Sequence, residues 1–225
     1  MRALRSIPVP AALSALLGSV MLAVSFSINN GPPENATGRQ LTEFIDQNRD
    51  SIAWGAWLQA VGPVFIVYFT VTIVVLAGAT GRPAGWMTLF GAATLMTVNL
   101  IEVVCYLTQL QTHSATMPRL STDLIRGVQH LYFFVAAPLL FVSLGVVILG
   151  SSVLPRLLGY LAILLGAAFA VAGIATVPDI TVPVAVQLSA SIQVLWWVAA
   201  ASVLLVRAWR ERGRNTDAPN RIRIR

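Results

Sequence analysis

The chain has 225 residues, of which 56% are hydrophobic and 11% are charged, with a net charge of +6. A soluble domain of this length needs more polar surface, so the composition excludes that class and indicates a membrane protein. All fifteen basic residues are arginines, and seven of them lie from Arg207 onward, directly after the last apolar segment. This cluster is typical of a cytoplasmic membrane flank, and no aromatic or glycine pattern accompanies it to indicate nucleic-acid binding.

The first apolar segment, residues 7–28, follows Arg2 and Arg5. It is longer than the apolar core of a signal peptide and suits a full membrane span. Small residues at Ser25-Phe26-Ser27 could allow cleavage, so a signal peptide is the alternative. We expect the segment to be retained as the first span.

Residues 29–50 form the longest polar connection. Thr37 and Gln40 have the spacing of a capping box, and Leu41, Phe44 and Ile45 form a short apolar stripe after them. The pattern predicts a short amphipathic helix on the membrane surface. This helix either covers the mouth of a pocket or only connects two spans.

Five further apolar segments are long enough to cross a bilayer. They cover approximately residues 51–79, 84–110, 124–149, 156–177 and 182–206. A tight turn at 80–83, a polar loop at 111–123 that ends in a helix cap at Ser121–Asp123, and a turn at Pro178-Asp179 lie between them. The sequence therefore predicts an all-α fold, a six-transmembrane-helix bundle. Residues 1–210 form one transmembrane domain, and residues 211–225 form a basic tail.

The fifth span carries a stripe of small residues. Gly159, Ala162, Gly166, Ala170 and Gly173 recur at helical spacing. Small residues let membrane helices approach closely, so we expect this stripe to face neighbouring helices and not lipid.

The arginines predict the topology. With six spans, eleven arginines fall on the side of the two termini and four on the other side. The excess of arginine marks the cytoplasmic side, so both termini are predicted to be cytoplasmic, with residues 29–50 and 111–123 outside. We expect the protein to be a multi-pass membrane protein.

A polar cluster interrupts the third and fourth spans. Asn99, Glu102 and Tyr106 lie at spacings of three and four, so they share one helix face, and Arg126 and His130 lie one turn apart after the loop. At 1.5 Å per residue, Glu102 lies roughly 12 Å and His130 roughly 10 Å below the outer membrane boundary. An acid at this depth is costly and indicates a function or a partner. We predict that Glu102 hydrogen-bonds Arg126 or His130, directly or through a water.

Two glutamines on other spans, Gln59 and Gln193, reach a similar depth in the outer half, whereas the inner half is almost entirely apolar. This asymmetry predicts a polar pocket that opens outward, without a polar path through the bundle. The candidate ligand-binding residues are Glu102, Arg126, His130, Asn99, Tyr106, Gln59 and Gln193.

The remaining residues argue against most chemistries. Cys105 is the single cysteine, which excludes an internal disulfide, and Glu102 with His130 alone is a weak metal signal. No phosphate-binding glycine loop or Gly-x-Ser-x-Gly motif is present, so we expect no cofactor and no metal site.

Three functions therefore stay open. The first is binding or transport of a small molecule or ion, and the second is a non-catalytic accessory subunit whose polar groups only join helices, at about 0.6 kcal/mol each. A membrane-embedded enzyme is third. The expected partners are the lipid bilayer, a small ligand, and either a second copy or another membrane protein.

Three short motifs resemble an uncharacterised bacterial family of six-span membrane proteins, known as a domain of unknown function. They are Asn99-Leu100-Ile101-Glu102, Ala137-Pro138-Leu139 and Leu154-Pro155-Arg156-Leu157-Leu158-Gly159. The resemblance implies the six-span fold and matches the family's intramembrane glutamate to Glu102. Members often carry an arginine where this chain has Asn99 and an acid where it has Gln193. The resemblance implies no activity.

Overall fold

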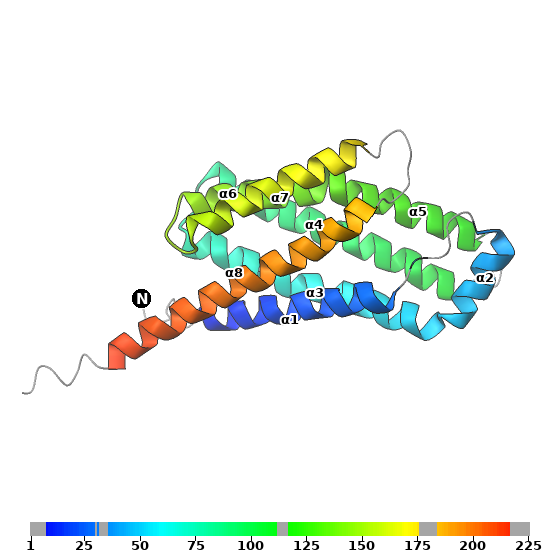
Figure 1. Ribbon diagram of the computed structural model, residues 1–225, viewed down its shortest axis with the longest axis horizontal. Helices are drawn as coiled ribbons and strands as arrows, with labels where there is room; N and C mark the ends of the chain where they lie inside the picture. Colours follow the sequence, from blue (N-terminus) through cyan, green and yellow to red (C-terminus); the bar gives the residue numbers. More distant parts are fainter. Residues whose placement is uncertain (1–7, 30, 32–35, 112–116, 176–183, 217–225) are drawn as a thin grey trace, which may run out of the picture.

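The computed structural model describes residues 8–29, 31, 36–111, 117–175 and 184–216. Nearly all of these residues are helical, and the described ranges contain no strand. The helices in chain order are α1 (Pro8–Ile28), α2 (Gly38–Gln47), α3 (Arg49–Leu76), α4 (Pro83–Gln111), α5 (Met117–Leu131), the π-helix η2 (Tyr132–Ala136), α6 (Ala137–Leu149), α7 (Arg156–Ala175) and α8 (Val184–Thr216), as Figure 1 shows.

Six helical segments are long and apolar enough to cross a membrane, which confirms the predicted fold class. α1, α3, α4 and α7 each provide one segment, and part of α8 provides another. The remaining segment, residues 119–149, combines most of α5 with η2 and α6. A chain in lipid must satisfy its backbone hydrogen bonds within each segment, which explains why the apolar runs are helical.

The six segments pack in chain order around a closed ring. α1 packs against α3, α3 against α4, α4 against α5 and α6, α6 against α7, α7 against α8, and α8 returns to α1. Figure 1 shows these helices running along one long axis. Because short connections keep consecutive helices adjacent, this arrangement is the one that the chain order favours.

Aromatic side chains fill part of the ring's interior. Phe141 lies between Phe169 and Trp197, with ring centroids 6.1 and 5.3 Å away, and Phe69 meets Trp197 from α3 at 6.0 Å. Phe69, Phe141, Phe169 and Trp197 are completely buried. This aromatic layer, together with Trp196, joins α3, α6, α7 and α8.

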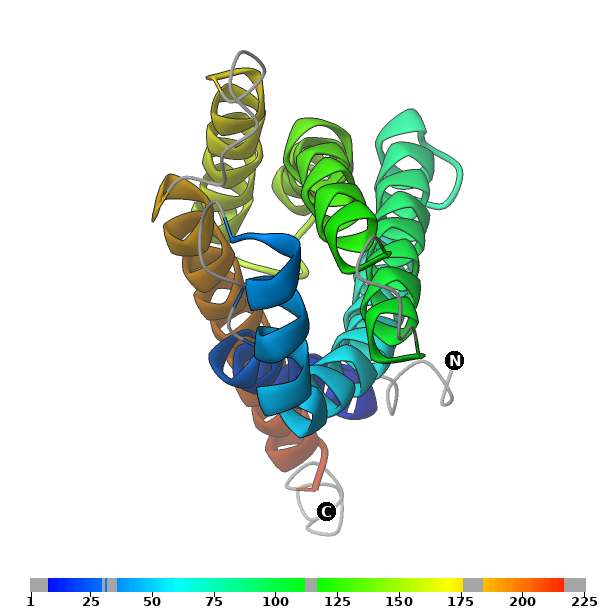
Figure 2. The ribbon, with the colours of Figure 1, turned by 90° about the vertical axis from the view of Figure 1, so that its right-hand side faces the viewer.

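The predicted amphipathic helix is present as α2. Thr37 caps it, and the side chains of Thr37 and Gln40 form both halves of the capping box, which confirms that motif. Leu41 and Ile45 are buried, and α2 contacts α3, α4 and α5. Figure 2 shows α2 in front at one end of the bundle.

The turn between α3 and α4 is built on Gly78, whose φ is +60°. The backbone N–H of Ala79 donates to the carbonyl of Val74, and that of Gly78 donates to Val75. These two bonds form a Schellman motif, in which the left-handed position favours glycine. The predicted tight turn at 80–83 therefore begins two residues earlier.

The prediction for the small-residue stripe is confirmed. Gly159, Ala162, Gly166 and Gly173 are buried, and α7 packs closely against α6 and η2. A side-chain carbon at Gly166 would lie 3.0 Å from the backbone nitrogen of Val142, and one at Gly173 would lie 3.0 Å from the Cα of Phe134.

Two predicted boundaries are different. α5 begins at Met117, so the prediction of a loop through Asp123 with a cap at Ser121–Asp123 is wrong. Proline is well tolerated in the first turn of a helix, and Pro118 allows the earlier start. α8 runs on to Thr216, past the predicted boundary between domain and tail at residue 211. The predicted Pro178–Asp179 turn lies outside the described residues.

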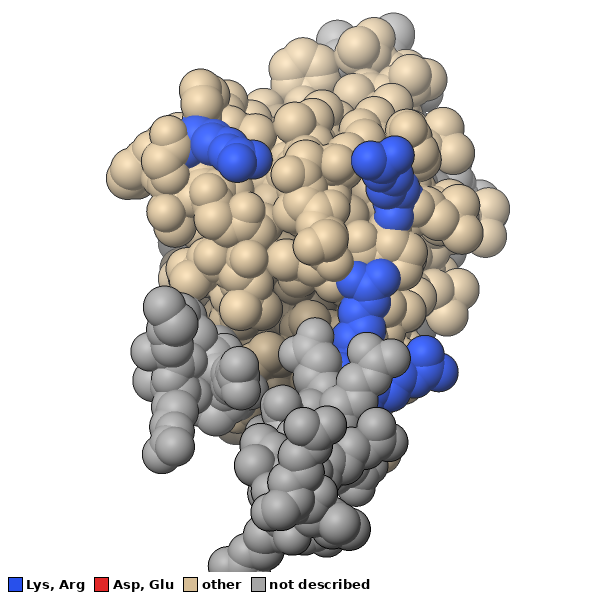
Figure 3. All heavy atoms as spheres, turned by 90° about the vertical axis from the view of Figure 1, so that its left-hand side faces the viewer, with Lys and Arg blue, Asp and Glu red and all other residues tan. Residues whose placement is uncertain are grey.

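The charges are divided between the two ends of the bundle. Figure 3 shows one end, where arginine side chains are visible and no acid is in view. The described arginines at the connections and helix ends of this side are Arg82, Arg156, Arg207 and Arg210. Among the described acids, Glu43, Asp46, Asp50 and Asp123 belong to α2, α3 or α5 at the other end, whereas Glu211 lies near the end of α8 on the arginine-rich side. This division agrees with the arginine rule, while the orientation in a membrane stays a prediction.

Candidate functional site

The candidate site is centred on the carboxylate of Glu102, which α4 presents to the bundle interior. Glu102 is 8% exposed. Gln59 Nε2 donates to its Oε2 at 2.5 Å, and Gln129 Nε2 donates to its Oε1 at 2.8 Å. The Tyr106 hydroxyl, one turn along α4, lies 3.3 Å from Oε1. We call Gln59, Glu102, Tyr106 and Gln129 the carboxylate cluster.

The carboxylate cluster joins three helices, because Gln59 belongs to α3 and Gln129 to α5. An ionised carboxylate only accepts hydrogen bonds, whereas amide N–H and phenol O–H groups donate them. The three contacts therefore complement an ionised Glu102. Leaving one of these groups without a partner in an apolar interior would cost about 1–3 kcal/mol.

Among the described residues, Glu102 makes no direct contact with Arg126 or His130, so the direct form of the prediction is wrong, while the contact through one water stays a prediction. Within the described part of the chain, the hydrogen bonds of Glu102 are those with Gln59, Tyr106 and Gln129, and it makes no ion pair. Arg126 instead lies 3.9 Å from Asp123 on its own helix, in a pair whose side chains are 39% and 59% exposed. Arg126 is half-buried, and its guanidinium stays partly exposed beside Asp123, which is less costly than full burial beside Glu102.

Helix phase explains which α5 residue reaches the acid. Adjacent residues on an α-helix point about 100° apart, so only one of Gln129 and His130 can face Glu102. The helix presents Gln129 to α4, and His130 is half-buried beside it.

Two other polar residues on α4 have separate partners. The side chain of Asn99 is buried and donates to the backbone carbonyl of Leu95, one turn earlier on the same helix, at 2.8 Å. Gln109 donates to Thr122 on α5 at 3.1 Å. Asn99 therefore does not contact the carboxylate cluster, although it shares a helix face with Glu102.

Gln193 lies in a second polar contact. The Tyr132 hydroxyl donates to Gln193 Oε1, and this pair joins η2 to α8. Gln193 is 4% exposed, and Tyr132 lies within electrostatic range of Glu102. The ring of Tyr132 also meets that of Phe169 at 5.7 Å, so this residue connects the polar groups to the aromatic layer.

Tyr132 owes its position to the π-helix. The backbone N–H of Ala137 donates to the carbonyl of Tyr132, five residues back, and Pro138 follows with no N–H of its own. A proline in a helix removes one hydrogen bond and crowds the preceding turn, which the wider π turn accommodates. π turns occur frequently at functional sites.

The C-terminal end of α1 also lies beside the carboxylate cluster. The side chain of Asn29, just after α1, lies near the Tyr106 hydroxyl and packs against Gly55. Ser25 donates to the backbone carbonyl of Gly55 at 2.9 Å. These contacts place the end of α1 beside the carboxylate cluster.

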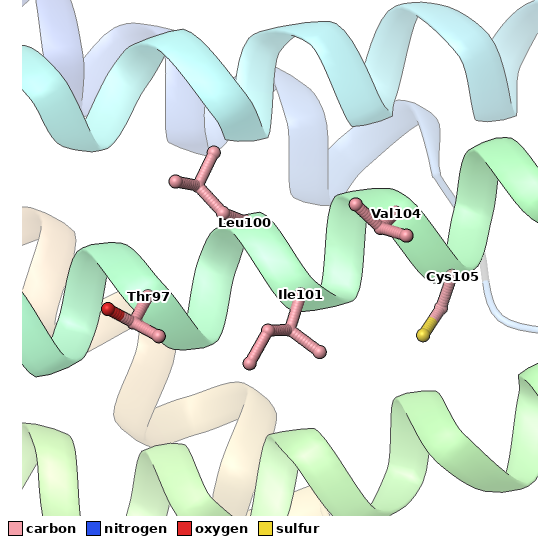
Figure 4. A pocket seen from close by; sticks show the side chains of 5 residues that line it. All are labelled: Thr97, Leu100, Ile101, Val104 and Cys105. Carbon is pink, nitrogen blue, oxygen red and sulfur yellow. The ribbon is translucent and has the colours of Figure 1, made fainter.

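An apolar hollow lies along α4 but is separate from the carboxylate cluster. Figure 4 shows its lining residues Thr97, Leu100, Ile101, Val104 and Cys105. Leu100, Ile101 and Val104 are more than 40% exposed on the outer surface of the bundle. The hollow therefore faces lipid and is not the predicted polar pocket.

The structure thus brings together three of the predicted site residues, Gln59, Glu102 and Tyr106. It adds Gln129, Tyr132 and Asn29, which the candidate list lacked. The spacing of three between Gln129 and Tyr132 places them on related helix faces, and this was the available signal for both. No group of three or more metal-ligating His, Cys, Asp or Glu residues occurs among the described residues.

These features define a multi-pass membrane protein with a buried carboxylate cluster. No family model, curated protein or solved structure matches the chain. The resemblance to an uncharacterised bacterial family therefore stays a prediction.

Proposed function

We propose that this protein binds, and transports, a small molecule or ion at the carboxylate cluster, in the inner membrane of a bacterium. The observation that carries the proposal is Glu102 itself. A carboxylate inside a membrane bundle is costly, and within the described chain its partners are neutral donors and not a cation. A bound ligand that neutralises the charge of Glu102 would explain why the carboxylate is buried there.

The position of the cluster supports access from one side. Glu102 lies nine residues before the end of α4, inside the half of the bundle that is nearer to α2. The aromatic layer of Phe141, Phe169 and Trp197 occupies the ring interior near Gln193. With the arginine-rich end in the cytoplasm, the site faces outward.

An accessory subunit is the second candidate. It is favoured by the fact that Gln59 and Gln129 already hydrogen-bond Glu102 and thereby join α3, α4 and α5. Membrane helices use such contacts for association. Under this alternative the cluster holds the bundle together and takes no ligand.

Native mass spectrometry of the full-length protein, released from detergent micelles, separates the two functions. We compare the wild type with Glu102→Gln, and use Gln109→Leu as a control that removes a buried interhelical glutamine outside the cluster. We expect wild type and Gln109→Leu to retain the same small adduct and a folded Glu102→Gln to lose it. An adduct-free wild type, with Glu102→Gln lowering only the melting temperature, would favour the accessory subunit.

A further inference from the structure

We infer that the ligand of the carboxylate cluster is a monovalent alkali cation; this inference rests on the proposed function and specifies its substrate class. The charge of the site is the first argument. Glu102 is the only described acid away from the ends of the bundle, and Arg126 and Asp123 already pair with each other. One cation with a single charge makes the buried site neutral, which lowers the cost of burying the acid.

The available ligands are hard oxygen atoms. The cluster holds two carboxylate oxygens on Glu102, one amide oxygen each on Gln59 and Gln129, and the phenol oxygen of Tyr106. Carboxylate and amide oxygens are the ligands that hard cations prefer. A soft metal would need several thiolate or imidazole ligands, and no cluster of three or more His, Cys, Asp or Glu residues occurs in the described part of the chain.

The glutamines can exchange their roles when a cation enters. Without a cation, their NH₂ groups donate to Glu102 at 2.5 and 2.8 Å. The last torsion of a glutamine is broad and roughly two-fold, so a half-turn brings the amide oxygen to the place of the nitrogen. The same side chains therefore stabilise the empty anion and, after the half-turn, ligate a cation beside it.

The single carboxylate favours a monovalent cation over a divalent one. A divalent cation at this cluster would leave one uncompensated positive charge in an apolar interior, which is unfavourable. Divalent sites in proteins usually combine several carboxylates. The other described acids lie on α2, α3, α5 and α8, near the two ends of the bundle. We therefore expect Na⁺ or K⁺ to bind and Mg²⁺ or Ca²⁺ not to bind.

The test measures the thermal unfolding of the full-length protein in detergent while NaCl or KCl replaces choline chloride at constant ionic strength. A ligand that binds only the folded state lowers the unfolding equilibrium constant by a factor of 1 + [ligand]/Kd, about a hundredfold at 100 times Kd. We expect a saturable rise in Tm with one alkali cation, and direct binding of radioactive ²²Na⁺ or ⁸⁶Rb⁺ at the same midpoint.

Variants assign the effect to the cluster. Glu102→Gln should abolish the alkali dependence, and Gln59→Leu should raise the half-saturating concentration at least tenfold. Gln129→Leu provides a second variant if Glu102→Gln does not fold, because Gln129 is only half-buried. The control Gln109→Leu should keep the wild-type midpoint.

The outcomes separate the two proposals. Stability that depends on Mg²⁺, Ca²⁺ or pH but not on Na⁺ or K⁺ would overturn the alkali cation. So would an alkali effect that survives both Glu102→Gln and Gln129→Leu. A different adduct that Glu102→Gln loses in native mass spectrometry would overturn the cation and leave the proposed function standing. A wild type with neither adduct nor cation dependence would overturn both.

Discussion

Replacing Gly166 by alanine tests a close contact between α7 and α6. The new Cβ would lie 2.8 Å from Val142 Cγ2, 3.0 Å from the backbone nitrogen of Val142 and 3.2 Å from Phe141 Cβ. Valine is stiff at χ1 and the backbone of α6 cannot rotate away, so α7 must move outward by several tenths of an ångström. Phe141 belongs to the aromatic layer, which transmits the displacement.

Overpacking of this kind commonly costs about 1–3 kcal/mol, roughly a five- to hundredfold change in the unfolding equilibrium constant. We expect Gly166→Ala to lower the melting temperature in detergent, and Gly166→Leu to lower it further. Intrinsic helix propensity acts in the opposite direction, because alanine is favoured over glycine by about 1 kcal/mol. The measured loss is therefore the steric cost less the gain in propensity.

Gly127 offers a matched control. It lies in α5, is exposed, and a Cβ there would meet nothing within 4 Å. Gly127→Ala receives the same gain in propensity with no steric cost, so it should leave stability unchanged or raise it. Equal melting temperatures for Gly166→Ala and Gly127→Ala would refute the close packing of α7 against α6.

Three further predictions follow from the fold. Reporter fusions at Gly81 and at the C-terminus should read cytoplasmic and one at Thr37 external; the reverse pattern would contradict the arginine rule. Phe169→Ala should cost about 3–5 kcal/mol in chemical unfolding, because a fully buried ring that meets two phenylalanines and a tyrosine leaves a cavity; a loss under 1 kcal/mol would mean that the aromatic layer is loosely packed. Thr88→Val removes the 3.1 Å hydroxyl contact with Ser143 between α4 and α6 and should cost only about 0.6 kcal/mol by the same measurement, so a loss above 2 kcal/mol would show that this contact anchors the bundle.

The spans could be predicted because hydropathy and chain length act locally. Lipid requires each segment to satisfy its own backbone, so a run of about 20 apolar residues specifies a helix without knowledge of its neighbours. The capping box at Thr37 and Gln40 is local for the same reason, and it is present. The stripe at Gly159 and Gly166 was also readable, because close approach needs small residues at helical spacing.

The contacts of Glu102 depend on the rotation of several helices about their axes, which spacing within one helix does not specify. Charge suggested Arg126 as the partner, but its half-exposed guanidinium pairs with Asp123, one turn earlier on the same helix. The neutral side chain of Gln129, three residues after Arg126, faces the bundle interior and donates to Glu102. The sequence also does not predict that Tyr132 begins a π turn ahead of Pro138. The π turn changes the direction in which the residues after Tyr132 face, compared with a regular α-helix.

The π turn also distinguishes binding from transport. Tyr132 hydrogen-bonds Gln193 on its polar side and meets Phe169 in the aromatic layer on the other. Under the proposed transport function, we expect the ligand to pass inward through an opening in that layer, and we expect this opening to break the Tyr132–Gln193 contact between η2 and α8. Because Pro138 lacks a backbone N–H, the fourth span bends most easily at η2. A protein that only binds its ligand keeps this contact closed, whereas a transporter must break and remake it in each cycle.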